Sequence, residues 1–347
     1  MEFHKKDIRA LSLEELRAFF IDRGEQAFRG EQVYQWLWQK GVHDFEAMTN
    51  LSLTTRQLLL EHFTINHIAI DSQQKSKDGT LKNAVRLYDD LVVESVLIPT
   101  ETRTTACVSS QVGCSLDCRF CATAQLKRMR NLHPDEIYDQ VKIMDQQSRL
   151  YYGRPLSNVV FMGMGEPLMN YKNVVAAIDK ITSSKGLGMA SKRITLSTSG
   201  IPKLIERLAD EYPKFNLAVS LHSARQNVRE QIMPFANRFP LDRLMESLRY
   251  WYQKTNNRVT FEYVIWKGIN DTQADIDALV QYCLQLPSKV NLIQYNSIGD
   301  IQFEQAAPQV VAHYQRELEK NGIRNTVRIS RGADIDAACG QLANKKQ

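Results

Sequence analysis

Apolar residues recur at steps of three and four over three stretches near the start of the chain, 11–20, 32–38 and 54–63. This spacing is typical of amphipathic helices, because residues three and four positions apart lie on the same helix face. We therefore expect residues 1–66 to form a small helical accessory domain.

From residue 67 the hydrophobic period changes to two. Alternation predicts short β-strands at 84–88, 92–98 and 104–108, separated by Asp-Gly and Asp-Asp turns. We expect residues 67–103 to form a β-rich bridge into the rest of the chain.

The remaining chain alternates between segments with a strand pattern and segments with a helix pattern. The predicted strands are 158–162, 193–198, 216–221, 258–266, 289–295 and 326–330, and the predicted helices are 134–149, 172–183, 201–211, 241–254, 274–286 and 308–321. Repeated βα units build a parallel sheet, either doubly wound or closed into a complete or partial barrel. About six units favour an α/β fold with a partial (β/α)6-type barrel over residues 104–347.

Composition narrows the class of protein only slightly. The 347 residues are 43% hydrophobic, and 44 basic against 39 acidic residues give a net charge of +5, which is compatible with nucleic acid binding but does not establish it. Six cysteines in a chain of this size indicate a reducing compartment. The N-terminus is charged and no apolar run has the length of a membrane span, so we expect a cytoplasmic protein, a monomer without a membrane partner.

Three of the cysteines form the triplet Cys114, Cys118 and Cys121, with CxxxCxxC spacing. Three thiolates are one short of a closed tetrahedral metal site, whereas a cubane iron–sulfur cluster on three cysteines keeps one iron open to a small molecule. The spacing favours the cluster. The alternative is a zinc site that Cys107 or Cys339 completes.

Polar clusters follow five of the predicted strands. They would lie at the carboxyl ends of the strands, which is where folds with parallel sheets bind their ligands. Each cluster alone is ambiguous, because a Gly-x-Gly is often a turn, Ser-Thr-Ser is often a helix cap, and a histidine is often structural. Together they predict a binding site at one rim. They are the cysteine triplet, Gly-Met-Gly-Glu-Pro at 163–167, Ser-Thr-Ser-Gly at 197–200, Ser-Leu-His-Ser at 220–223 and Tyr-Asn-Ser at 295–297.

The cysteine triplet with Phe120 before its last cysteine, followed by Gly-x-Gly-Glu after the next strand, resembles the radical S-adenosylmethionine (SAM) superfamily. The resemblance implies that Cys114, Cys118 and Cys121 hold a [4Fe-4S] cluster whose open iron binds SAM, and that reductive cleavage of SAM gives a 5′-deoxyadenosyl radical. It also implies a set of SAM-binding residues: Gly165, Glu166, Ser197, Ser220, Leu221, His222 and Asn296.

Further motifs narrow the resemblance to the RNA adenine-C2 methyltransferases. These are Cys-Val-Ser-Ser-Gln-Val-Gly-Cys at 107–114, Phe-Met-Gly-Met-Gly-Glu-Pro-Leu at 161–168 and Arg-Gly-Ala-Asp-Ile-Asp-Ala-Ala-Cys-Gly-Gln-Leu at 331–342. The resemblance implies methylation of C2 of an adenine in 23S rRNA, at the peptidyl-transferase centre, and of the adenine 3′ of the anticodon in some tRNAs. It further implies two SAM molecules per turnover and a one-electron donor such as ferredoxin or flavodoxin.

Adenine C2 is electron-poor, so it does not attack the methyl group of SAM directly. In the resembled family a cysteine carries the methyl group first, and Cys339 matches that residue, close to the C-terminus. Cys107 matches a thiol that forms a transient disulfide with Cys339 to release the product, and Glu94 matches the base that removes the C2 proton. Alternation also places Glu94 on an apolar strand face, although a salt-bridged structural role stays open there, as a cluster-ligand role does for Cys107 and a structural role for Cys339.

Candidate RNA contacts are basic and aromatic side chains: Lys127, Arg128, Arg130, Lys192, Arg193, Trp36 and Trp38. Two rival functions stay open. One is methylation at adenine C8, from which Pro167 separates this chain only weakly, and the other is a zinc-stabilised RNA-binding protein without catalytic activity.

Overall fold

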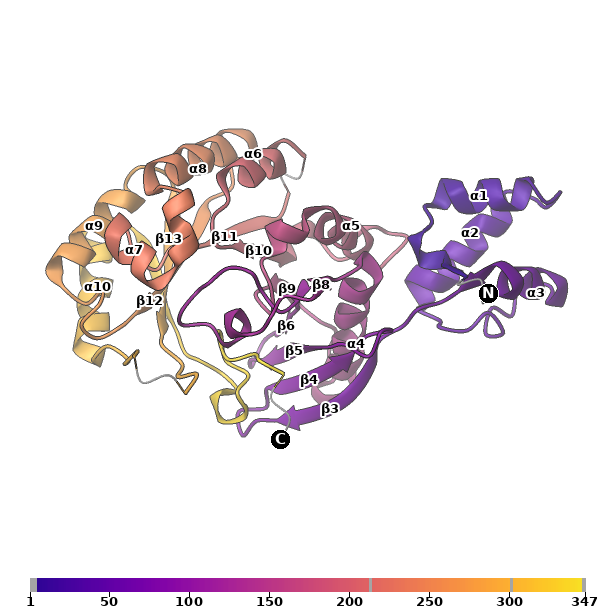
Figure 1. Ribbon diagram of the computed structural model, residues 1–347, viewed down its shortest axis with the longest axis horizontal. Coiled ribbons are helices and arrows are strands. Elements are labelled where there is room, and N and C mark those ends of the chain that lie inside the picture. Colours follow the sequence, from indigo (N-terminus) through magenta and orange to yellow (C-terminus); the bar gives the residue numbers. More distant parts are fainter. Residues whose placement is uncertain (1–4, 212–213, 300–301, 345–347) are drawn as a thin grey trace.

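The computed structural model describes residues 5–211, 214–299 and 302–344. Its first part is the predicted helical domain, which lies at one end of the molecule (Figure 1). This domain contains α1 (Leu13–Ile21), α2 (Phe28–Gln35) and α3 (Leu53–His62). A capping box of Ser12 and Glu15 starts α1, and the Ser52 side chain caps α3. A π-helical turn, Trp36–Lys40, extends α2 and ends at Gly41.

The helical domain is pinned to the rest of the protein through α4 (Pro134–Tyr152). Both Nη atoms of Arg9 donate to the Asp139 carboxylate, at 2.6 and 2.7 Å, and both side chains are buried. The Tyr138 hydroxyl donates to the carbonyl of Trp38, whose ring packs edge-on against Tyr138. Trp38 is therefore buried in this contact. The sequence analysis named it as a candidate RNA contact, but a buried ring cannot stack on RNA bases.

The main domain contains a ten-stranded sheet in the order β14-β13-β12-β11-β10-β9-β6-β5-β4-β3. Its first seven strands run parallel, which confirms the predicted α/β fold with a partial barrel. They are β6 (Thr104–Cys107), β9 (Asn158–Phe161), β10 (Ile194–Thr198), β11 (Asn216–Ser220), β12 (Val259–Ile265), β13 (Ser288–Gln294) and β14 (Arg324–Arg328). In the described residues β14 and β3 form the two edges of the sheet, so it is open.

The stretch predicted as a bridge forms β3 (Ala69–Lys75), β4 (Leu81–Arg86) and β5 (Val92–Pro99). These strands continue the same sheet in antiparallel fashion. The sequence analysis did not predict β3 because its residues are mostly polar and exposed, Ser72 and Gln73 among them.

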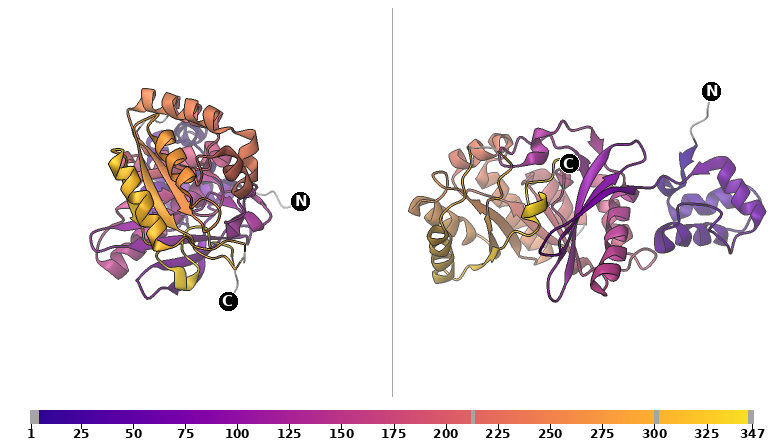
Figure 2. Two further views of the ribbon diagram at one scale, coloured as in Figure 1. Left: turned by 90° about the vertical axis from the view of Figure 1, so that its left-hand side faces the viewer. Right: turned by 90° about the horizontal axis from the view of Figure 1, so that it is seen from below.

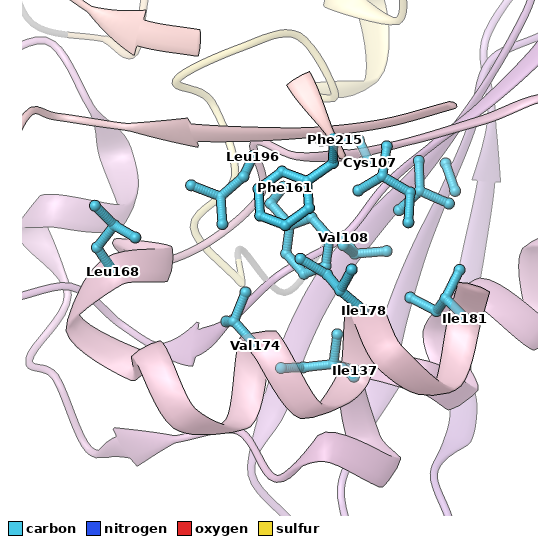
Figure 3. Packing of buried hydrophobic residues seen from close by; sticks show 14 of the residues in the cluster. Cys107, Val108, Ile137, Phe161, Leu168, Val174, Ile178, Ile181, Leu196 and Phe215 are labelled. Carbon is cyan, nitrogen blue, oxygen red and sulfur yellow. The ribbon is translucent and has the colours of Figure 1, made fainter. Parts of the chain in front are cut away.

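The helices lie on the outer side of the curved sheet (Figure 1). Besides α4 they are α5 (Tyr171–Thr182), α6 (Pro202–Glu211), α8 (Leu241–Thr255), α9 (Gln273–Cys283) and α10 (Pro308–Lys320). The short α7 (Gln226–Ile232), which the sequence did not predict, instead packs against the cysteine loop, where the Arg119 amide donates to the Ile232 carbonyl at 3.0 Å. Figure 3 shows Ile137 of α4 and Val174 and Ile178 of α5 packed toward Phe161 and Leu196 on the sheet. This core fixes the strands whose carboxyl ends carry the polar clusters.

The last described segment, 329–344, leaves β14 and runs beside β3 to β5 (Figures 1 and 2). Hydrogen bonds hold this segment in place, among them four from the cysteine loop and from the turn between β3 and β4. The Ala122 amide donates to Gly340 at 2.7 Å and Thr123 Oγ1 to the Leu342 carbonyl at 2.6 Å, while the Ser76 hydroxyl and the Lys77 amide donate to Asp334 at 2.6 and 3.2 Å. The C-terminal segment therefore covers the open side of the sheet near the cysteine triplet. It also closes part of the site described next.

Candidate active site

The predicted polar clusters meet in one cavity at the carboxyl ends of the parallel strands, which we call the rim pocket. Six of the seven predicted SAM-binding residues line it, namely Gly165, Glu166, Ser197, Ser220, His222 and Asn296. Leu221, the seventh, is fully buried and its side chain does not line the pocket. The wall also includes Phe120, Cys121 and Cys339.

Glu166 is held in place by three hydrogen bonds from its neighbours. Its carboxylate accepts from Thr198 Oγ1 at 2.7 Å, from the Ser199 amide at 2.7 Å and from the Leu168 amide at 3.0 Å. Burial raises the pKa of this carboxyl, and these donors offset only part of the rise. The bonds use three of the roughly four acceptor directions of a carboxylate, which leaves one for a ligand amine or hydroxyl.

Gly165 makes the turn that carries Glu166 into the rim pocket. Its φ is +96°, and a Cβ added there would lie 2.5 Å from the Cβ of Gln111. Since neither the dihedral nor the space suits a side chain, glycine is required at this position. The Gln111 side chain in turn accepts from the Glu166 amide at 2.9 Å.

His222 is a neutral donor in the wall of the rim pocket. Burial, and next the positive Arg229, lowers its pKa to about 3. Its Nδ1 accepts from the Val264 amide at 3.1 Å, so the proton lies on Nε2. The ring packs edge-on against Phe120 with centroids 4.8 Å apart, and this contact joins the cysteine loop to the barrel.

A second cavity of about 460 Å³, which we call the side chamber, adjoins the rim pocket. Cys107 lines the side chamber, and Cys339 lines both cavities. All six cysteines are unpaired. Burial, and next the Cys339 sulfur, raises the pKa of the Cys107 thiol to about 12. The structure thus brings together the two cysteines that the sequence placed 232 positions apart.

Glu94 lies outside the residues that line either cavity. Its Oε2 accepts from the backbone amides of Ala343 and Asn344, at 2.8 and 3.2 Å, and its Oε1 lies 3.4 Å from Lys82 Nζ. The C-terminal segment therefore occupies one oxygen of this carboxylate and a buried lysine pairs with the other. In this arrangement both carboxylate oxygens of Glu94 have partners, and the side chain lines neither the rim pocket nor the side chamber.

Two charged residues that the sequence analysis missed also border the site. Arg328 on β14 lines both cavities and pairs with the buried Glu262 on β12, at 3.1 Å. A signal existed for Glu262, because it is the one charged residue in the apolar strand Val-Thr-Phe-Glu-Tyr-Val-Ile at 259–265.

Comparison with known proteins identifies the chain. Residues 6–65 match the ribosomal RNA large subunit methyltransferase N-terminal domain, and residues 108–281 match the radical SAM superfamily. A protein from Flavobacterium psychrophilum, named a probable dual-specificity RNA methyltransferase RlmN, is 65% identical over 100% of both chains. The dual-specificity RNA methyltransferase RlmN of Syntrophus aciditrophicus is 41% identical over 99% of this chain and 98% of its own. The chain belongs to the RlmN family of radical SAM RNA methyltransferases.

A crystal structure of a radical SAM methyltransferase from Sphaerobacter thermophilus shares the fold of this RlmN family member. It superposes with a TM-score of 0.91 at 36% identity, over 97% of this chain and 99% of that chain. The protein is therefore an enzyme, and the alternative of a non-catalytic zinc-stabilised RNA-binding protein is wrong.

None of the described helices is long and apolar enough to cross a membrane.

Membership in the superfamily implies a [4Fe-4S] cluster and SAM, and the cysteine loop fits a cluster. Burial raises the pKa of all three thiols of the triplet, to about 11 for Cys114, and the Cys121 and Cys114 sulfurs raise that of Cys118 further. Buried thiols need a positive group to become thiolates, and the iron of a bound cluster would provide it.

Among the described residues no group of three or more His, Cys, Asp or Glu side chains is placed to hold a metal ion. Cys114, Cys118 and Cys121 are therefore expected as cluster ligands from their motif and from the superfamily match.

The predicted RNA contacts differ in how free they are. Lys127, Arg128, Lys192 and Arg193 are exposed. Arg130 instead pairs with Asp89 at 2.7 Å and with Glu136 at 2.8 Å, so two carboxylates neutralise its charge. Trp36 is partly exposed with Lys40 over its ring.

Proposed function

We propose that this enzyme methylates C2 of adenine in 23S rRNA, at the peptidyl-transferase centre, and in some tRNAs at the adenine 3′ of the anticodon. The observation that carries the proposal is the side chamber, where Cys107 and Cys339 line one cavity that adjoins the rim pocket. Two cysteines outside the cluster motif fit a reaction in which the protein itself carries the methyl group. The chemistry of adenine supports this route, because C2 lacks the electron density to attack SAM.

When bound, the cluster and two SAM molecules per turnover would supply the methyl group and the 5′-deoxyadenosyl radical. Cys114, Cys118 and Cys121 would hold the cluster, and Gly165, Glu166 and the rim-pocket hydroxyls would bind SAM. Neutral His222 would donate a hydrogen bond from Nε2. Phe120 and His222 would exclude water from this end of the barrel.

Cys339 would carry the methyl carbon to adenine C2 from its place between the two cavities. Release of the product balances as a thiol–disulfide reaction. The Cys107 thiolate attacks the Cys339 sulfur, the S–S bond forms, and the bond between that sulfur and the methylene carbon breaks. The carbon keeps the electron pair and takes one proton, which gives the methyl group. An external dithiol would then reduce the disulfide.

Glu94 is the proposed base for the C2 proton. Its carboxylate would first have to exchange the amides of Ala343 and Asn344 for the substrate, so the C-terminal segment would move when RNA binds. We also propose ferredoxin or flavodoxin as the one-electron donor. The enzyme would act as a monomer in the cytoplasm, where its RNA substrates are.

Mass spectrometry of nucleosides from a deletion strain tests the proposal. We expect 2-methyladenosine to disappear from 23S rRNA and from tRNA, and to return when the gene is restored. Loss of 2-methyladenosine from 23S rRNA alone would mean that tRNA is not a substrate. Loss of 8-methyladenosine with 2-methyladenosine unchanged would instead establish the C8 activity and overturn the proposal.

A further inference from the structure

A hydrogen-bonded chain across three neighbouring strands fixes the guanidinium of Arg328. Strand register sets Glu262 opposite Asn291, and Asn291 opposite Thr326. Thr326 donates to Asn291 at 2.7 Å, and Asn291 donates to Glu262 at 2.8 Å. Glu262 Oε2 accepts from Arg328 Nη1 at 3.1 Å. Asn291 therefore holds one carboxylate oxygen of Glu262, and Arg328 binds the other. The pairing of the strands in the sheet thus sets the position of Arg328.

The same guanidinium faces the chamber that Cys107 lines, and Met162 lies between the two. Its Nη1 is 3.7 Å from the sulfur of Met162, and the backbone amide of Met162 interacts with the Cys107 sulfur. Arg328 and Cys107 also line the side chamber together. The positive charge is therefore presented to the chamber from β14, while Cys107 faces it from β6.

Cys107 needs such a charge if it is to act as a nucleophile. Burial, and next the Cys339 sulfur, raises the pKa of its thiol to about 12, and the Arg328 charge acts in the opposite direction. Only the thiolate attacks sulfur, so an unaided thiol at this position would react slowly near neutral pH. The Cys339 sulfur holds the pKa of Arg328 above its ordinary value, so the guanidinium stays charged throughout.

We propose that Arg328, held by Glu262, is a positioning residue that prepares Cys107 to attack the Cys339 sulfur. The inference rests on the proposed function for the attack itself, in which the S–S bond forms and the sulfur–methylene bond breaks. The effect of the Arg328 charge on the Cys107 thiol does not depend on that function. It can therefore be measured without RNA.

The first experiment measures how fast iodoacetamide alkylates Cys107 at different pH values, by peptide mass spectrometry of the cluster-loaded protein. In Arg328→Met we expect the pH midpoint for Cys107 to rise by about one unit, which is roughly ten-fold slower alkylation below the midpoint. Arg328→Lys keeps the charge and should stay close to the wild type. An unchanged midpoint in Arg328→Met would overturn the proposal.

The controls come from the same chain. Arg103 and Arg331 also line the side chamber, alongside Cys121 and Cys339, so Arg331→Met removes an equal charge from that cavity. It should leave the Cys107 midpoint in place, and an equal shift there would mean that Arg328 has no special role. Cys283, buried far along the chain, reports on general opening and should react alike in all variants. If Arg328→Met fails to retain iron, the Arg328→Lys variant tests the proposal instead. A pH midpoint of Cys107 alkylation equal to that of the wild type supports the proposal, and a raised midpoint contradicts it.

The second experiment uses labelled RNA and denaturing gels. Arg328→Met should accumulate a protein–RNA crosslink through Cys339, and raising the pH should release it, whereas in Cys107→Ala the crosslink should persist at every pH. If Cys107→Ala forms no crosslink, the proposed function is wrong although the alkylation result can still stand. If Arg328→Met has lost SAM binding and keeps the Cys107 midpoint, Arg328 is a SAM-binding residue and the inference is wrong.

Discussion

At the scale of single residues, the proposed roles of Cys107 and Cys339 fall at different steps, so variants of the two cysteines should fail in different ways. Cys339→Ala removes the methyl carrier, so we expect neither methylated product nor protein–RNA crosslink. Cys107→Ala removes the resolving thiol alone, so we expect the crosslink to accumulate and turnover to fall to background. Gels of labelled RNA and nucleoside analysis read both results. A Cys107 variant without iron would instead make Cys107 a cluster ligand.

The triplet gives a second prediction at this scale. Cys118→Ala leaves two thiolates, too few to hold a cubane, so iron content and SAM cleavage should be lost. Circular dichroism should show that the N-terminal helices stay folded, since they form a separate domain. Full iron retention in this variant would refute Cys118 as a ligand.

His222 gives a prediction about pH. Its pKa is about 3 in the folded protein and about 6.5 in an unfolded chain, so the unfolded state binds the extra proton first as the pH falls. The stability contribution is complete above about pH 6.5 and declines toward pH 3. Between pH 7 and 5 the free energy of unfolding should fall by about 2 kcal/mol more in the wild type than in His222→Gln. Urea unfolding measures this, and an equal change in the free energy of unfolding of the two proteins between pH 7 and 5 would contradict the prediction.

At the scale of elements, the turn after β9 positions the carboxylate of Glu166, which is proposed to bind SAM. Gly165→Ala combines an unfavourable φ with a clash against Gln111, so we expect a loss of about 1–3 kcal/mol in stability and markedly weaker SAM binding. Urea unfolding and equilibrium dialysis measure the two effects. Gly268→Ala is the matched control, because its φ is +72° and a Cβ there meets nothing within 4 Å. Equal SAM affinity in the two variants would show that the turn is not required.

The elements also show where sequence reasoning succeeds and where it stops. The alternation of periods located the parallel strands and five polar clusters, because side-chain pattern and chain direction are local properties. It could not find Arg328, whose role depends on the register of three strands that are distant in the sequence. It also could not show that Glu94 contacts Ala343, which lies 249 positions away.

At the scale of the whole molecule, the buried Arg9–Asp139 pair holds the N-terminal helical domain on the barrel. Asp139→Asn leaves the arginine charge buried without its partner, so we expect a loss of about 3–5 kcal/mol. Methylation of RNA should fall while SAM cleavage without RNA continues, as anaerobic assays of both activities can show. The double variant Arg9→Met/Asp139→Leu should recover much of the stability. Equal losses of both activities in Asp139→Asn would mean that the pair supports the barrel itself.

The contact between Glu94 and the C-terminal segment has a practical consequence for handling the protein. An affinity tag fused shortly after Asn344 would lie close to the backbone amide that binds the proposed base. Pulling on that end, or crowding it with a folded fusion partner, would disturb Glu94 and Cys339 together. The N-terminal domain lies at the far end of the molecule (Figure 1), so a tag placed there leaves the catalytic segment undisturbed.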